Sequence, residues 1–378
     1  MIKRIVKILA GAFITLALLT LVAYVATGPQ DPAADSSSAD WLQAGPFRIA
    51  SRDYRFVDES RPTAENRGVP SQPSRTLITT LWYPENGPNE MPLVVHSHGI
   101  LSERTELDYL AESLASRGYV VAAANYPLTS GEAVGGANAV DVVNQPADIS
   151  FLMDSILALE GNDKPFEGTI DPNKIGLTGY SLGGLTTFLA TYHQRWREPR
   201  VSAAVAIAAP SAAFSPDFFS NSDVPMLAVA GTADAVIEYR YNAADLPQRA
   251  PKLNLVTIEG GTHLGFARIA EPYMRWMENP DNLACAALLE TVDEEPEEIV
   301  NILGTKAEGI EADREIPTIC DYGIPKGIHP GRQQMIAQIA TVSFLESIFN
   351  SDLHKREDAH HQLSTVLAND FAEVTYAD

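Results

Sequence analysis

Short apolar runs alternate with amphipathic stretches along most of the chain. The apolar runs predict strands at residues 47–50, 77–83, 93–96, 119–124, 174–178, 201–208, 226–230 and 253–258. Apolar side chains at helical spacing predict helices near residues 107–114, 148–160, 182–196 and 333–349. Strands that alternate with helices are typical of βαβ units. The pattern therefore predicts an α/β fold, with a mostly parallel central sheet flanked by helices.

Segments that lack this alternation divide the chain. Residues 1–27 carry three basic side chains ahead of an apolar stretch of about 19 residues, which predicts a signal anchor or a signal peptide. Residues 28–40 are rich in Pro, Ala, Asp and Ser and predict a tether. The remainder divides into a domain at 41–350, interrupted by an insertion at 268–326 before the final helix, and a polar tail at 351–378.

The N-terminal segment and the composition indicate where the protein is located and which partners it can bind. The chain after residue 27 is expected outside the cytoplasm, attached to the membrane if the segment stays uncleaved and secreted if it is removed. A formal net charge of −22 repels phosphate backbones and argues against a nucleic-acid partner. The two cysteines, Cys285 and Cys320, are expected to form a disulfide in an oxidising compartment, and two buried free thiols are the alternative.

The strongest local signal is the G-x-S-x-G sequence at residues 179–183, placed between a predicted strand and a predicted helix. A serine at such a turn has a strained backbone, and side chains in place of the flanking Gly179 and Gly183 would collide with their neighbours. Ser181 would then be exposed at a helix N-terminus, where a developing anion is stabilised. The motif predicts a nucleophile, and a tight turn with a surface serine is the structural alternative.

A serine nucleophile needs an imidazole base and a carboxylate that orients it. Asp234 follows the strand at 226–230, and His263 follows the strand at 253–258, so both side chains are expected at one rim of the sheet. Glu238 and Asp223 are alternative acids. The other candidate histidines are His193, placed within a helix, and four that follow no strand, namely His329, His354, His360 and His361.

Two backbone N–H groups are expected to bind the oxyanion of an acyl-transfer reaction. Leu182 follows the nucleophile, and Ile100 ends the His98-Gly99-Ile100 sequence after the strand at 93–96. His96 and His98 could instead form a metal pair, although no third ligand is suggested nearby. Three phenylalanines between two later strands could line an acyl or aromatic pocket or pack locally, namely Phe214, Phe218 and Phe219.

With these motifs, the chain resembles the α/β-hydrolase superfamily, in particular its platelet-activating-factor acetylhydrolases, dienelactone-hydrolase-like proteins and cutinase-like polyester hydrolases. The resemblance rests on residues 92–99, 146–152, 179–184, 231–234 and 261–263. It implies hydrolysis of a carboxylic ester in a small-molecule, lipid or polyester substrate, without a metal or an organic cofactor. Dienelactone hydrolases carry a cysteine at the position of Ser181, and the insertion at 268–326 is longer than such enzymes need.

Two other functions use the same scaffold. A peptidase or amidase has the same triad, and a comparison of amide with ester turnover distinguishes it from an esterase. A non-catalytic binding protein is the third possibility, but the triad positions are all filled in the expected chain order, which argues against it.

Overall fold

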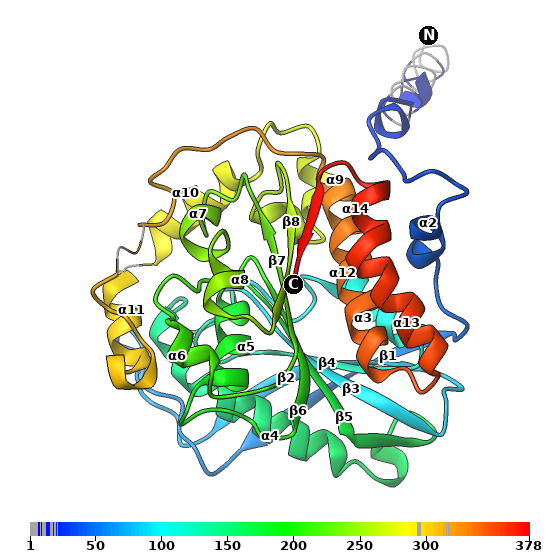
Figure 1. The fold of residues 1–378 in the computed structure, drawn as a ribbon. Coiled ribbons are helices and arrows are strands. Elements are labelled where there is room, and N and C mark those ends of the chain that lie inside the picture. The colour runs from blue at the N-terminus through cyan, green and yellow to red at the C-terminus, as the bar shows by residue number, and fades with distance from the viewer. Residues whose placement is uncertain are drawn as a thin grey trace.

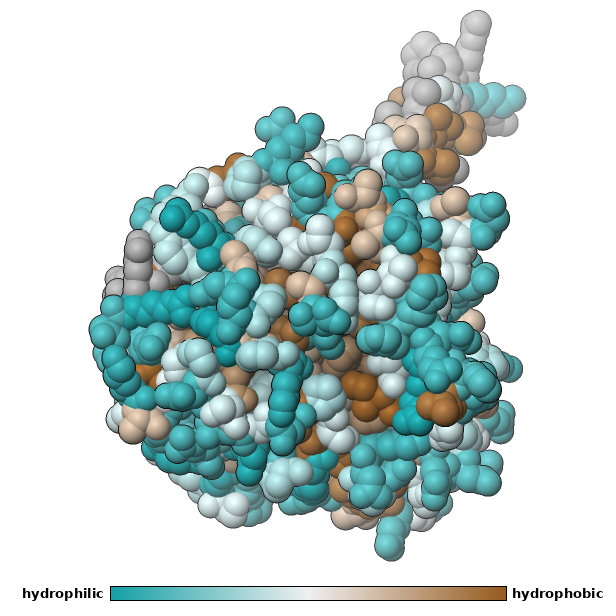
Figure 2. Space-filling model, in the orientation of Figure 1, coloured by the Kyte–Doolittle hydropathy of each residue, from teal (hydrophilic) through white to brown (hydrophobic). Residues whose placement is uncertain are grey.

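The computed structural model describes residues 7, 9, 13–15, 18, 20, 22–292, 296–314, 316 and 318–378. About half of the predicted signal or anchor segment at 1–27 therefore lies outside the described residues. No helix within the described ranges has the length and apolar character needed to cross a membrane. Figure 2 shows a largely hydrophilic surface on the body of the protein, as the acidic composition predicts.

A nine-stranded sheet forms the centre of the described chain, in the order β1-β2-β4-β3-β5-β6-β7-β8-β9. Strands β3 to β8 pair in parallel, and β1, β2 and β9 pair antiparallel at the two sides. The prediction of a mostly parallel sheet is confirmed. The strands are β1 (Ile49–Asp58), β2 (Arg75–Pro84), β3 (Glu90–Ser97), β4 (Val120–Asn125), β5 (Thr169–Tyr180), β6 (Val201–Ile207), β7 (Met226–Gly231), β8 (Leu253–Ile258) and β9 (Val374–Ala377).

Helices cover both faces of this sheet (Figure 1). Helices α3 and α12 pack on one face, and α4 and α5 pack on the other. The central strands are therefore apolar on both sides, and every residue of β4 is buried. The α-helices are α2 (Ser37–Leu42), α3 (Asp108–Ala115), α4 (Gln145–Leu157), α5 (Leu182–Tyr192), α6 (Pro216–Phe219), α7 (Tyr239–Asn242), α8 (Leu246–Arg249), α9 (Ala270–Met274), α10 (Asp281–Thr291), α11 (Pro296–Leu303), α12 (Pro330–Phe349), α13 (Leu353–His361) and α14 (Leu367–Asp370).

Shorter helical turns complete the elements. Four are 3₁₀ helices within the described residues, and the π-helix η5 joins α13 to α14. Their bounds are η1 (Ala139–Asn144), η2 (Gly161–Asp163), η3 (Leu264–Phe266), η4 (Lys306–Glu308) and η5 (Gln362–Val366).

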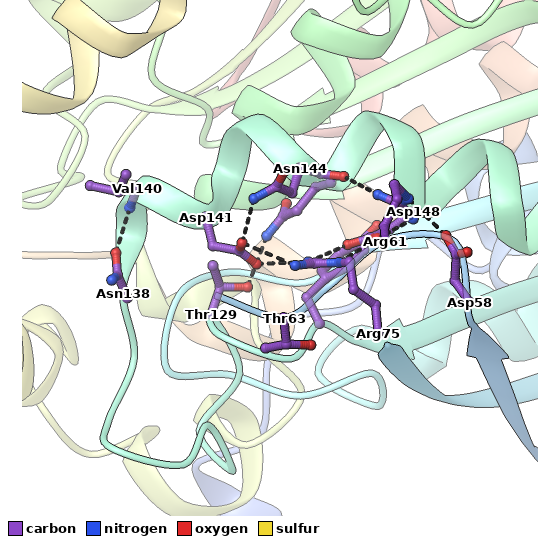
Figure 3. Close-up of polar contacts among 12 residues, drawn as sticks. Asp58, Arg61, Thr63, Arg75, Thr129, Asn138, Val140, Asp141, Asn144 and Asp148 are labelled. Atoms are coloured by element: carbon purple, nitrogen blue, oxygen red, sulfur yellow. Dashed lines mark hydrogen bonds and ion pairs between the residues drawn. The ribbon is translucent and has the colours of Figure 1, made fainter. Parts of the chain in front are cut away.

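A buried ion-pair network ties the antiparallel side of the sheet to the helical layer (Figure 3). Arg75 on β2 is 1% exposed and donates two hydrogen bonds to Asp148 on α4, at 2.7 and 2.8 Å. It also binds Asp141 in η1, and Arg61 approaches Asp148 from the surface. Because these carboxylates are buried, the arginine is needed to compensate their charge.

The C-terminal residues differ from the prediction. Residues 351–378 were expected as a polar tail, but they form α13, η5, α14 and strand β9, which pairs with β8. The buried stripe of Ala359, Leu363, Leu367 and Phe371 explains the difference, because all four side chains are buried and the last three pack in the same core cluster as α12. Their apolar spacing is masked in the sequence by the polar residues between them.

The predicted tether also has more structure than its composition indicates. Helix α2 begins at Ser37, inside the expected tether, and the side chain of Gln362 binds the hydroxyls of Ser37 and Ser38. Further back, Arg332 on α12 donates to the carbonyl oxygen of Gln30 at 2.7 Å. The end of this segment is therefore held on the C-terminal helices by polar contacts that local composition does not reveal.

Candidate active site

Ser181 occupies the sharp turn between β5 and α5. Its backbone has φ 54° and ψ −121°, a conformation that non-glycine residues adopt only where the surroundings impose it. A Cβ atom at Gly179 would lie 2.0 Å from the carbonyl oxygen of Gly183, and one at Gly183 would lie 1.9 Å from that of Ser97. Both flanking positions therefore require glycine, and the tight packing holds Ser181 at the N-terminus of α5.

The structure brings Ser181, His263 and Asp234 together at one rim of the sheet. His263 Nε2 lies 2.9 Å from Ser181 Oγ, and His263 Nδ1 lies 2.8 Å from Asp234 Oδ2. All three side chains are buried. With Nδ1–H donating to the carboxylate, Nε2 accepts the hydrogen bond from the serine hydroxyl. This is the tautomer that a serine nucleophile needs.

The neighbouring charges change the pKa of the His263 imidazole. Burial lowers the pKa of His263, but the carboxylates of Asp234, Asp281 and Glu106 together raise it by more, so the net shift is upward from the ordinary value. Asp234 also accepts the backbone N–H groups of Val236 and Ile237 through its other oxygen. The carboxylate is thus fixed by three donors.

The alternative acids and bases lie in other contacts. Asp223 forms an ion pair with Lys252 at the surface, and Glu238 precedes α7. His193 binds the carbonyl oxygen of Leu303 and stacks on Trp196. The others also lie elsewhere: His329 binds the carbonyl oxygen of Thr27, His354 is exposed beside Glu357, and His360 and His361 are in the last turn of α13.

The two predicted oxyanion donors flank Ser181. Within the described part of the chain, neither Ile100 N–H nor Leu182 N–H donates to a protein acceptor. Both residues line the same cavity as Ser181. The turn that carries Ile100 comes close to the serine, since a Cβ atom at Gly99 would lie 3.2 Å from Ser181 Cβ. Both residues thus border the cavity at Ser181, and neither N–H group is bound to a protein acceptor within the described residues.

His96 and His98 have separate structural partners. His98 Nε2 accepts the N–H of Tyr126 at 3.0 Å, so Nδ1 carries the hydrogen and donates to the carbonyl oxygen of Gly99 at 2.7 Å. Burial lowers the pKa of His98, which keeps it neutral in this role. His96 contacts Thr178 and Glu106. Both histidines therefore support the turn at Gly99, His98 directly and His96 through Glu106, which accepts the Gly99 N–H.

Asp281 is a residue of the site that sequence reasoning missed. Its carboxylate accepts the backbone N–H groups of Ala235, His263 and Leu264 at 2.7 to 3.0 Å. It thus joins the loop that carries Asp234 to the loop that carries His263. Burial and the nearby Asp234 carboxylate raise the pKa of Asp281 to about 6. An aspartate in a helix's first turn is common, so the sequence offers no signal of this role.

The predicted insertion lies over the site and is attached to it. Cys285 on α10 and Cys320 form a disulfide, which confirms the predicted pairing. Cys320 N–H also donates to the carbonyl oxygen of Ala235, one residue after Asp234. The disulfide fits a protein that folds outside the cytoplasm.

Two cavities bounded by described residues meet at Ser181. One has a volume of about 220 Å³ and extends between α5 and the insertion, and the other, about 790 Å³, is lined by His263 and opens beside α9. Of the three predicted pocket phenylalanines, Phe214 lines the smaller cavity. Phe218 and Phe219 are in neither lining. They lie behind Phe214 in a buried aromatic cluster, so local packing replaces the predicted pocket role for these two.

A serine at a strained strand-to-helix turn, on a mostly parallel sheet covered by helices, defines the α/β-hydrolase class. Residues 64–278, more than half of the chain, match the family model described as "PETase: PET hydrolase-like". The chain therefore belongs to the PET hydrolase-like family of ester hydrolases, as the sequence resemblance predicted.

A solved structure supports the same fold. The ferulic acid esterase from Streptomyces cinnamoneus is similar with a TM-score of 0.54 and 18% identity, over 89% of this chain and 99% of that chain. No curated protein sequence matches the chain.

Proposed function

We propose that this protein is a serine hydrolase that cleaves carboxylic esters through an acyl-enzyme intermediate. The observation that carries the proposal is the hydrogen-bonded chain from Ser181 through His263 to Asp234. Family membership supports ester hydrolysis as the reaction. The disulfide supports a location outside the cytoplasm.

In the proposed reaction, His263 Nε2 accepts the proton of the Ser181 hydroxyl while the oxygen attacks the ester carbonyl carbon. The N–H groups of Ile100 and Leu182 donate to the oxyanion of the tetrahedral intermediate. The intermediate collapses as His263 protonates the departing alcohol. Water, deprotonated by the same imidazole, then attacks the acyl-enzyme and releases the acid and the free serine. Asp234 keeps the imidazole in its tautomer and stabilises its positive charge.

Replacement of Ser181 by alanine tests the proposal. Hydrolysis of p-nitrophenyl butyrate should fall by about 10⁵-fold or more, since the loss of a triad nucleophile has effects of this order. Circular dichroism should show an unchanged fold. Parallel assays with the matching p-nitroanilide compare ester with amide cleavage, and the proposal predicts faster ester turnover. Full activity in Ser181→Ala, or faster amide turnover, would contradict it.

A further inference from the structure

One wall of the smaller cavity at Ser181 is formed by a segment that lies outside the family match. We call the described part of residues 279–320 the roof; it contains α10, α11 and both cysteines. The match to the family ends at residue 278. Leu288, Val300 and Leu303 of the roof line the cavity together with Leu185 and Phe214. The family's substrates therefore do not define what this cavity holds.

The cavity is apolar and accepts no charge. None of its described lining residues is charged. Two of its polar lining residues already bind each other, because Asn242 Oδ1 accepts the N–H groups of Ser211 and Ala212, and the Ser211 hydroxyl donates to the carbonyl oxygen of Asn242. A charged substituent would lose its hydration there without meeting an opposite charge. An apolar group would gain from burial.

The position of His263 decides which part of an ester enters which cavity. The imidazole must protonate the departing alcohol, so the alcohol lies on the side of the serine where His263 is exposed to substrate. His263 belongs to the lining of the large open cavity and is absent from the described lining of the smaller one. The smaller cavity instead borders Ser181 beside Ile100 and Leu182, the proposed oxyanion donors.

We infer that the roofed cavity is an acyl-binding site, which selects esters of compact, uncharged, apolar carboxylic acids. The alcohol part lies in the open cavity, where its size is less restricted. The volume of about 220 Å³ is below the roughly 300–1,000 Å³ typical of pockets that enclose a whole ligand, so it suits one arm of the ester. This inference rests on the proposed function and specifies its substrate.

A series of p-nitrophenyl esters with linear acyl chains tests the inference. Because the alcohol is constant, kcat/KM should rise about fourfold for each added methylene that the cavity buries, and should fall once the chain exceeds it. An ester with a terminal carboxylate on the acyl chain should react more slowly than the uncharged ester of equal length.

Two substitutions at one roof position give opposite expectations. Val300→Phe fills part of the cavity and should move the optimum to shorter acyl chains, whereas Val300→Ala enlarges the cavity and should move it to longer ones. Leu283→Ala, in the open cavity, is the matched control. It should change the ranking of alcohols at constant acyl group and leave the acyl optimum in place.

The outcomes separate the two proposals. Absence of hydrolysis for every ester in the series, with folded protein, would overturn the proposed function. Hydrolysis without dependence on acyl length, or an acyl optimum that is the same in both Val300 variants, would overturn the acyl-site inference and leave ester hydrolysis standing. An optimum that moves with Leu283→Ala instead would assign the acyl group to the open cavity.

Discussion

Replacement of Asp281 by asparagine tests how the catalytic loops are held. The carboxylate accepts three backbone N–H groups, two of them from His263 and Leu264. An asparagine has one acceptor oxygen, and its amide group faces donors, so at least one N–H loses its partner. A hydrogen bond to a charged group contributes about 1.5–3 kcal/mol. If that energy orients His263, kcat should fall by about 10- to 100-fold.

The same variant should alter two pH dependences. The charge of Asp281 raises the pKa of His263, so its removal lowers that pKa and moves the acidic limb of the kcat/KM profile to lower pH. The pKa of Asp281 itself is raised to about 6, whereas an unfolded aspartate titrates near 3.9. The folded state therefore disfavours the ionised form, and stability should decrease by about 2 kcal/mol as pH rises from 4 to 7. Asparagine does not titrate, so the variant should lack this decrease.

Steady-state profiles between pH 4 and 9, with urea unfolding at pH 4 and 7, measure both effects. Asp148→Asn is a matched control, because it alters a buried carboxylate in the separate Arg75 network (Figure 3). It should lower stability without moving the acidic limb. Unchanged kcat and an unmoved limb in Asp281→Asn would refute the positioning role.

Three further predictions concern the triad, the turn and the core. Asp234→Asn should lower kcat by about 10⁴-fold, because His263 then adopts the wrong tautomer. It should also move the acidic limb of the kcat/KM profile to lower pH, because the Asp234 carboxylate raises the pKa of the imidazole. Rates measured across the pH range check both effects. Gly183→Ala should fail to give stable, active protein, because its Cβ would overlap the Ser97 carbonyl; expression and thermal melts check this. Arg75→Met should cost about 3–5 kcal/mol in urea unfolding, since it leaves two carboxylates buried without their partner; a loss below 1 kcal/mol would contradict the network's importance.

The central strands and the turn at Ser181 could be predicted because their signals are local. Strands β3 to β8 are apolar on both faces, and glycines flank the serine between a strand and a helix. Asp234 and His263 each follow a strand, and parallel strands end at one rim. Chain order and strand ends were therefore enough to choose residues that the structure brings together.

The remaining features depend on contacts between distant segments. Strand β9 pairs with the edge of β8, and the buried stripe that precedes it is interrupted by polar residues in the sequence. Asp281 contacts the loops of Asp234 and His263 only because helix α10 packs against them, and these loops are distant from it in the sequence. The cavity under the roof needs side chains from α5 and α11 at once. The hydrophobic periodicity of a single segment does not reveal contacts of this kind between distant segments.

The most direct test of the central claim is covalent labelling by a fluorophosphonate, followed by peptide mass spectrometry. The account predicts one label per molecule, on Ser181, with loss of esterase activity in proportion to labelling. Labelling should vanish in Ser181→Ala and slow sharply in His263→Ala, because the hydroxyl then lacks its base. Inactivation through a label on another residue, with Ser181 unmodified, would contradict the account.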